Sequence, residues 1–420
     1  MTFAEWRGME PAAAAAEVHR RVRTRLEPAQ QRAVLAWLRP EAELAAALAA
    51  ADPGRPLGRV PYFAKDLFDT VGAPTAAGST FLPQERTAGA RDGALAAACA
   101  RAGAVLAGKT HLHEFAYGIT GENPHHGDCH RPGFPGRTTG GSSSGSAAAV
   151  AAGIVPLALA TDTGGSVRVP AAFCGLFGLR LTPGEPWIAD AVPLAPTCDT
   201  AGWFTAGAED LAAVIEALLP PEQPTAGPLR GRSWLPPGID PEVAAAFGRA
   251  AGQLAEPAEA ALAEGLAAGF APALEAYHTI IAAEAWAWHR GWFPRRAAEY
   301  DPNVRQRLEN AARVTPEQMT AARAAAEGVR AVWREYFRGH DFLVLPATPT
   351  AAPTKAECTP ELRNRIIQLT APASLGGQPV LSLPVALPGG LTTGLQVIFP
   401  DPRGPALRWA LRTFQPDRAV

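Results

Sequence analysis

Apolar and polar positions along the first part of the chain follow two different periods. Residues 9–50 are rich in Ala, Leu and Arg at helical spacing, and they predict two helices interrupted near Pro28 and Pro40. From Gly58 the pattern changes. PYFAKDLFD predicts a strand with a polar insertion, and DGALAAACARAG predicts a helix that ends at Gly103 before the apolar run AVLAG. Strands and helices that alternate in this way are typical of an α/β fold.

The rest of the chain leaves this pattern and returns to it. After Gly140 we expect a helix, a buried strand VPLALATD, a Gly-rich turn TGGS and a Pro-rich stretch to about Pro196. A helix over 208–219 and the linker candidate PPEQPTAGP follow. Residues 241–338 are helical, and DFLVLPATPT and PVLSLPVAL are again strand-like. We therefore predict one core with a helical insertion, and we find no internal repeat.

Composition narrows the class of protein. The 420 residues are 47% hydrophobic and 19% charged, and the net charge of -2 without a Lys/Arg stripe argues against nucleic-acid and anionic membrane surfaces. The N-terminus carries Glu and Arg within its apolar part, unlike a signal peptide, and no run of about twenty apolar residues predicts a membrane span. Five scattered cysteines without a CxxC pair favour reduced thiols and a cytoplasmic location. Cys174, among apolar residues, is expected to be a buried and unreactive thiol.

Two motifs suggest chemistry that their context does not support. GAVLAGKT, Gly103 to Thr110, matches the Walker A pattern, but a helix precedes it and its variable positions are apolar as in a strand. We therefore interpret Lys109 as a structural charge. The segment from His111 to His130 holds five of the nine histidines and three further potential ligands, Glu114, Asp128 and Cys129. Its spacing matches no recognised ligand pattern, so we expect no metal and interpret it as a polar loop at the rim of a site.

The stretch GGSSSGSAAAVAAG, from Gly140, begins with seven residues that carry no side chain larger than a hydroxymethyl group. A second Gly-Ser turn, TDTGGS, ends at Ser166, and Lys65 stands alone in an apolar strand. Small residues let a substrate approach the backbone, and successive N–H groups in a tight turn bind an anion. Serine needs a base to become a nucleophile, and a buried lysine can lose its proton near neutral pH. From residue types alone, flexible linkers and an ion pair between Lys65 and Asp66 remain alternatives.

These segments resemble the amidase signature family. Gly140 to Gly184 is similar to the whole signature segment, and PYFAKDLFD is similar to the lysine strand of the family. The likeness extends through KTHLHEFAYGITGENPHHG, PLAPTCDTAGWF, PVLSLPVAL and GLQVIFP. It covers roughly residues 55–220 and 340–400. HLHEF is a departure, because Asn and Asp are commoner there, and it puts the pocket rim in doubt.

The resemblance implies an α/β fold with a single domain, in which a central mixed β-sheet is covered by helices on both faces. We expect residues 1–54 to form an N-terminal helical cover and residues 55–420 to form the catalytic domain, with the helical excursion 241–338 within it. The tryptophans of the excursion have helical spacing and are expected in a core, whereas a homodimer surface is the open alternative. They are Trp286, Trp288, Trp292 and Trp333.

The resemblance also implies a Ser-cisSer-Lys triad. Ser166 matches the nucleophile, Ser142 the bridging serine after a cis peptide bond, and Lys65 the base. The oxyanion hole is matched by the backbone N–H groups of Thr163, Gly164, Gly165 and Ser166. We expect further side chains to support the turn and the loop, namely Ser143, Asp162 and Arg168. Two residues are expected at the substrate pocket, Tyr117 and Gly141.

The implied function is that of a serine amide hydrolase, an amidase. It would form an acyl-enzyme with small amide, aryl amide, carbamate or urea-like substrates and would need no cofactor. The expected partner is the small-molecule substrate, without nucleic acid or membrane. Two alternatives stay open: a glutaminase-type component of a tRNA-dependent amidotransferase, and a non-catalytic or nucleotide-binding protein.

Overall fold

Successive strand residues point to opposite faces of one mixed sheet, and both faces are covered. On β2, Tyr62 and Ala64 join the core beneath α6, α9, α10 and α17, whereas Phe63 joins the core beneath α2, α4 and α7. Strands buried on both faces read as nearly continuous apolar runs, as PYFAK does apart from its lysine. Lys65 lies two residues after Phe63, and the strand period of two therefore places it on the α7 face.

The computed structural model describes residues 1–87, 89–221 and 227–416. These residues form a ten-stranded sheet with the order β1-β3-β2-β4-β6-β5-β9-β10-β8-β7. The pairs β2–β3, β2–β4 and β7–β8 are parallel and the other pairs are antiparallel. The predicted mixed sheet with helices on both faces is confirmed. The strands are β1 (Leu35–Leu38), β2 (Pro61–Lys65), β3 (Val105–Thr110), β4 (Leu157–Asp162), β5 (Phe177–Arg180), β6 (Thr200–Thr205), β7 (Gly231–Ser233), β8 (Phe342–Pro346), β9 (Val380–Ala386) and β10 (Thr392–Ile398).

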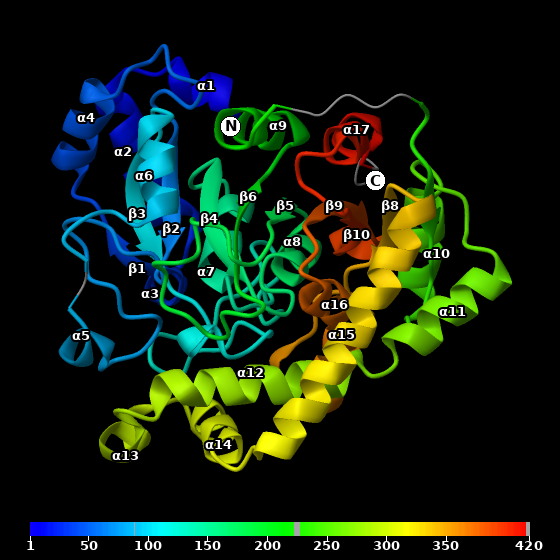
Figure 1. Cartoon of the computed structure of the whole chain (residues 1–420). Coiled ribbons are helices and arrows are strands. Elements are labelled where there is room, and N and C mark those ends of the chain that lie inside the picture. Colours follow the sequence, from blue (N-terminus) through cyan, green and yellow to red (C-terminus); the bar gives the residue numbers. More distant parts are fainter. Residues whose placement is uncertain (88, 222–226, 417–420) are drawn as a thin grey trace.

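The helices surround this sheet, with α12 running beneath it and α15 rising along one side (Figure 1). They are α1 (Phe3–Arg7), α2 (Pro11–Arg25), α3 (Pro28–Val34), α4 (Glu41–Ala50), α5 (Leu82–Glu85), α6 (Ala94–Arg101), α7 (Ser144–Ala151), α8 (Arg168–Cys174), α9 (Ala208–Leu218), α10 (Pro241–Ala251), α11 (Ala260–Phe270), α12 (Ala273–His289), α13 (Phe293–Arg296), α14 (Pro302–Ala311), α15 (Pro316–Gly339), α16 (Pro360–Gly376) and α17 (Pro405–Thr413). Four short 3₁₀ turns are η1 (Glu114–Ala116), η2 (Ala297–Glu299), η3 (Lys355–Glu357) and η4 (Pro388–Gly390).

The N-terminal segment differs from the two helices predicted over residues 9–50. It forms α2, α3 and α4, with β1 between the last two. The breaks near Pro28 and Pro40 are correct, because each proline starts or precedes a helix. The strand β1 was missed. LAWL is too short to show a period, and it becomes a strand only because it pairs antiparallel with β3.

The helical insertion leaves the sheet and returns to it at neighbouring strands. β7 precedes α10, β8 follows α15, and these two strands pair in parallel. Of the linker candidate PPEQPTAGP, residues 222–226 lie outside the described residues. Trp333 is 1% exposed, and the other three tryptophans of the insertion are partly buried against the same core, as expected: Trp286, Trp288 and Trp292.

Candidate active site

The lysine at the end of β2 is fully buried and contacts two hydroxyl groups. Lys65 Nζ lies 2.7 Å from Ser142 Oγ and 2.8 Å from Thr161 Oγ1. The alternative ion pair with Asp66 is not formed, because the Asp66 carboxylate lies 2.6 Å from Lys109 Nζ. Lys65 is thus a cation in its protonated form that has hydroxyl groups, and no carboxylate, as its hydrogen-bond partners.

Burial decides the charge of this lysine. Desolvation lowers the pKa of Lys65 to about 7, against the smaller opposing effect of the negative charges on Asp162 and Asp199. A substantial fraction of Lys65 is therefore neutral near pH 7. A neutral amine has a lone pair, and it can accept the proton of the Ser142 hydroxyl.

The serine loop before α7 is held by backbone contacts on several sides. The peptide bond between Gly141 and Ser142 is cis. Ser142 O accepts a hydrogen bond from the His113 N–H at 3.1 Å, and Ser143 Oγ donates to Thr161 O at 3.1 Å. A Cβ on Gly141 would lie 2.6 Å from Gly121 N, so two backbone segments meet there. This close approach explains the bare Gly-Ser sequence, and it places Gly141 against backbone.

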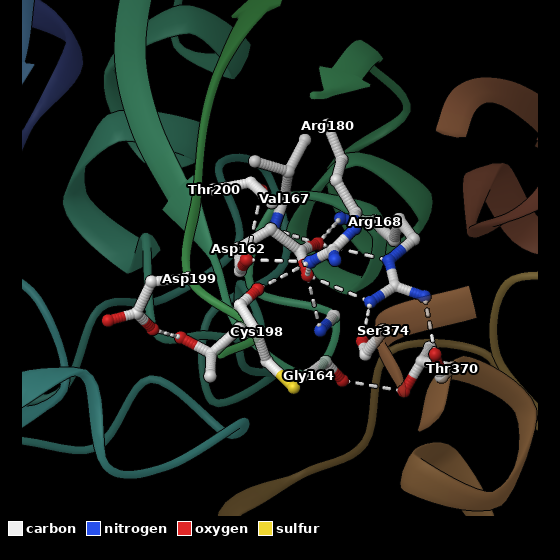
Figure 2. A network of polar contacts seen from close by, with 12 residues as sticks. Asp162, Gly164, Val167, Arg168, Arg180, Cys198, Asp199, Thr200, Thr370 and Ser374 are labelled. Atoms are coloured by element: carbon white, nitrogen blue, oxygen red, sulfur yellow. Dashed lines mark hydrogen bonds and ion pairs between the residues drawn. The ribbon is translucent and has the colours of Figure 1, made fainter. Parts of the chain in front are cut away.

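The turn between β4 and α8 is built around one carboxylate, that of Asp162 (Figure 2). Its oxygens accept hydrogen bonds from Gly165 N–H at 2.8 Å and Val167 N–H at 2.9 Å. Arg168 and Arg180 each approach Asp162 Oδ1 at 2.8 Å, and all three side chains are fully buried. The two guanidinium groups hold the pKa of Asp162 well below its usual range although burial opposes them. The support expected from Asp162 and Arg168 is therefore visible as direct contacts.

The orientation of the turn follows from where its carbonyl groups point. Asp162 O accepts from Arg180 Nη1 at 2.7 Å, Gly164 O from Thr370 Oγ1 at 2.5 Å, and Gly165 O from Val169 N at 2.8 Å. In a trans peptide the next N–H points opposite to the carbonyl. The N–H groups of Thr163 and Ser166 therefore point away from these partners.

Gly165 has a different role from the one expected. Its N–H donates to Asp162 Oδ1, so this donor has an acceptor within the turn. Its φ angle is +126°, a region that side chains with a Cβ rarely adopt. Gly165 thus closes the turn, and the oxyanion donors that we retain are the N–H groups of Thr163, Gly164 and Ser166.

Ser166 starts the segment that leads into α8 and is 3% exposed. The serine loop packs on the same helix, because a Cβ on Gly140 would lie 3.1 Å from Val169 Cγ1 and 3.3 Å from Pro170 N. Together with the bond from Ser143 to Thr161, these contacts bring the loop and the turn together at the end of β4.

Tyr117 lies at the edge of this region and is partly buried. The guanidinium of Arg307, from α14, lies 5.7 Å from the centre of its ring and donates to the Tyr117 carbonyl oxygen. Burial raises the pKa of the Tyr117 phenol to about 12, so it stays protonated. Its place in a pocket wall remains a prediction.

The histidine segment forms ring contacts and one ion pair. His111 and His126 stack with ring centroids 3.7 Å apart, and His125 Nε2 lies 3.0 Å from Glu114 Oε1. Among the described residues no group of three or more His, Cys, Asp or Glu is arranged to hold a metal ion. Cys174 is buried as expected, and desolvation raises the pKa of its thiol to about 12. The five cysteines are free.

The Walker-like motif is a strand. Gly103 to Thr110 covers β3, and Lys109 is buried with Asp66 and with the Pro74 carbonyl, 2.7 Å from its Nζ. A phosphate loop needs its glycines between a strand and a helix, and here they lie before and within a strand. The interpretation of Lys109 as a structural charge is confirmed.

Sequence reasoning missed four residues that contact the loop or the turn. Thr161 lies within the quoted TDTGGS turn, and Arg180 and Asp199 lie in segments that carried the resemblance, so their place in these segments was the signal that could have found them. Asp199 accepts from Thr163 Oγ1 at 2.5 Å. Thr370 gives no local signal, because it lies in α16, far along the chain from the turn.

The fold and this geometry define a class: an α/β enzyme with a buried lysine and serines beside a Gly-rich turn. Its family is shown by comparison with known proteins. The sequence model of the Amidase family matches residues 17–402, and the chain belongs to this family. It is thus an enzyme of a group of hydrolases that act on amides. The recognition of the family from sequence is confirmed.

Several relatives match most of the chain. The GatA-type component of the glutamyl-tRNA(Gln) amidotransferase of Thermus thermophilus is 33% identical, with 84% of this chain and 83% of that protein covered. The AtzE component of the 1-carboxybiuret hydrolase of Pseudomonas sp. (strain ADP) is 34% identical, with 82% and 80% covered. A crystal structure of an amidase has a TM-score of 0.84 at 31% identity, with 98% of each chain covered.

A shorter match is closer in sequence. Amidase 1 of Oryza sativa subsp. japonica is 45% identical over 165 residues, which are 39% of this chain and 38% of that protein. The chain thus aligns with well under two thirds of this relative. Within the described part of the chain, no helix is long and apolar enough to cross a bilayer.

Proposed function

We propose that the protein is a serine amide hydrolase in which Ser166 is the nucleophile, Ser142 relays protons and Lys65 is the base. The contact that carries this proposal is the 2.7 Å approach of a fully buried Lys65 Nζ to Ser142 Oγ. The pKa of Lys65, about 7, supports a base that is available at neutral pH. The cis peptide before Ser142 agrees with the matched position of the family.

The first step makes the acyl-enzyme. Neutral Lys65 accepts a proton from Ser142, which accepts one from Ser166. The Ser166 oxygen forms a bond to the carbonyl carbon of the amide, and the π electron pair moves to the carbonyl oxygen. The backbone N–H groups of Thr163, Gly164 and Ser166 stabilise this oxyanion, and the N-terminus of α7 favours the same negative charge.

The second step releases both products. The oxyanion collapses, the C–N bond breaks, and the leaving nitrogen takes a proton from Ser142, which is reprotonated by the Lys65 ammonium. Water then attacks the acyl carbon and gives its proton to the relay. The bond to Ser166 breaks, Ser166 regains its proton, and the carboxylic or carbamic acid leaves.

The proposed substrates are small amides, including aryl amides, carbamates and urea-like compounds. Two relatives that match most of the chain support the urea-like and acidic end of this range. One is the AtzE component of the 1-carboxybiuret hydrolase, and the other is the 2-amino-5-chloromuconic acid deaminase of Comamonas testosteroni, 34% identical over 84% of this chain. We place the enzyme in the cytoplasm and propose that it works without a cofactor or metal.

A glutaminase-type component of a tRNA-dependent amidotransferase is the second candidate. It is favoured by the 33% identity to such a component over most of both chains. The two candidates differ in partner dependence. A free hydrolase turns over alone, whereas an amidotransferase component needs its partner protein, tRNA and ATP. A homodimer is compatible with either.

Turnover by the purified chain tests the choice. We expect release of ammonia or amine from at least one member of a panel containing a simple amide, an anilide, a carbamate, biuret and glutamine, without any added protein, tRNA or ATP. Ser166→Ala should lower the rate by at least about 10³-fold. Ser382→Ala is the matched control, because this serine is equally buried, lies in β9 and should leave turnover unchanged. Activity on glutamine alone that appears only with a partner protein would favour the second candidate.

A further inference from the structure

The central peptide of the turn is held at both ends. The Gly164 carbonyl accepts a hydrogen bond from Thr370 Oγ1 at 2.5 Å, and the N–H of the same peptide, that of Gly165, donates to Asp162 Oδ1 at 2.8 Å. Figure 2 shows Thr370 reaching Gly164 from α16, on the side opposite Asp199. One anchor thus comes from the signature segment, and the other from a helix 206 residues further along the chain.

This peptide is the one most able to rotate. It joins two glycines, which have no Cβ to restrict the backbone, so its carbonyl and N–H could exchange directions at low cost. Such a rotation would move Gly165 away from Asp162 and displace the next peptide, whose N–H belongs to Ser166. The orientation of the oxyanion donors therefore depends on both anchors.

Thr370 is itself fixed to the turn. Its carbonyl accepts from Arg168 Nη1 at 2.8 Å, and the other terminal nitrogen of Arg168 donates to Ser374 Oγ at 2.7 Å. The Thr370 hydroxyl is fully buried. It also lies 3.3 Å from Ile366 O and 3.4 Å from Ile367 O within its own helix, so its single hydrogen is shared unequally in favour of the much shorter contact to Gly164.

We propose that Thr370 is a positioning residue for the oxyanion hole: its hydroxyl holds the Gly164–Gly165 peptide in the orientation that directs the turn's N–H groups at the substrate carbonyl. This proposal rests on the proposed function. It places a determinant of catalysis in α16, outside the signature segment. It acts on the transition state more than on the bound amide, because the negative charge develops only as the C–O bond forms.

The test compares isosteric and conservative variants. Thr370→Val keeps the shape and removes the donor, and Thr370→Ser keeps the donor. Thr392→Val is the matched control, since Thr392 Oγ1 also donates to a backbone carbonyl, that of Ala172 at 2.8 Å, but in α8 away from the turn. We measure kcat and KM on an amide substrate and the inhibition constant of a trifluoromethyl ketone, which forms an oxyanion with the nucleophile.

Thr370→Val should lower kcat about tenfold to a hundredfold, below the roughly 10²- to 10³-fold loss for a direct oxyanion donor. KM should change by less than about twofold, and the ketone should bind more weakly by the same factor as kcat falls. Thr370→Ser should restore most of both, and Thr392→Val should match the wild type. If Thr370→Val does not fold, Thr370→Cys replaces it, with only a weak donor and an intermediate loss expected.

Equal kcat and ketone affinity in Thr370→Val, Thr392→Val and the wild type would overturn the proposal. A loss of kcat without any loss of ketone affinity would also overturn it, because a disturbed oxyanion hole must weaken both. Absence of any amide turnover in the wild type would instead count against the proposed function.

Discussion

At the scale of single residues, catalysis depends on how a cation can be stored without charge. Lys65 loses the solvation that an ammonium needs, and its partners are hydroxyls of Ser142 and Thr161. Two carboxylates nearby, Asp162 and Asp199, oppose the loss of its proton. Asp162 is already paired with two arginines, whereas Asp199 accepts only from a hydroxyl and from backbone N–H groups. Asp199 is therefore the residue through which the pKa of Lys65 can be tuned.

This tuning predicts the pH dependence of kcat/KM. Lys65 must be neutral to act as the base, so kcat/KM should rise with pH and level off above an apparent pKa of about 7. Asp199→Asn removes a negative charge that favours the ammonium. The pKa of Lys65 then falls, and the acid limb should move to lower pH. Glu335→Gln, at an exposed pair with Arg338, should leave it in place. A limb that stays fixed, or moves to higher pH, in Asp199→Asn would exclude Lys65 as the titrating base.

At the scale of secondary structure, one carboxylate joins three elements. Asp162 ends β4, Arg168 starts α8 and Arg180 ends β5, and all are fully buried. A buried ion pair is costly to desolvate, and its removal is costlier when it leaves charges without a partner. In this protein two guanidinium groups depend on Asp162. The network thus fixes the turn and also binds the centre of the sheet to α8.

Asp162→Asn should therefore lower the free energy of unfolding by about 3–5 kcal/mol, the range found when one partner of a buried ion pair is removed. Asp240→Asn is the control, because its pair with Arg365 is exposed and should contribute about 0–1 kcal/mol. Urea denaturation measures both. The stabilisation by Asp162 is present above its unfolded pKa of about 4, so the difference from the wild type should shrink as the pH falls below about 4. A loss in Asp162→Asn no larger than that in Asp240→Asn would contradict this role of the carboxylate.

At the scale of the whole molecule, much of the site is encoded locally in the sequence and part of it is not. The lysine strand, the serine loop and the turn are each visible in the chain, because small residues and a lone lysine in apolar surroundings are unusual. The pairing of Asp66 with Lys109 in place of Lys65 depends on the register of β2 beside β3. The strand β1 and the anchor at Thr370 depend on contacts between distant segments, which no local pattern carries.

The contacts around the expected substrate pocket are less local still. Tyr117 contacts Arg307 from the helical insertion, and a Cβ on Gly164 would lie 2.0 Å from the hydroxyl of Tyr277 on α12. The insertion thus reaches the catalytic turn itself. Its sequence showed only helices and buried aromatic residues, because a contact between a tyrosine and a distant glycine leaves no periodic signal.

Activation of Ser166 by Ser142 and Lys65 is the feature on which the proposed mechanism depends. It is tested by treating the pure protein with a serine-directed phosphonyl fluoride and locating the adduct by peptide mass spectrometry, alongside Lys65→Ala and Ser142→Ala variants. We expect rapid, stoichiometric labelling of Ser166 that is lost in both variants. An unlabelled Ser166 in the folded wild type, or labelling that persists without Lys65 and Ser142, would contradict the mechanism.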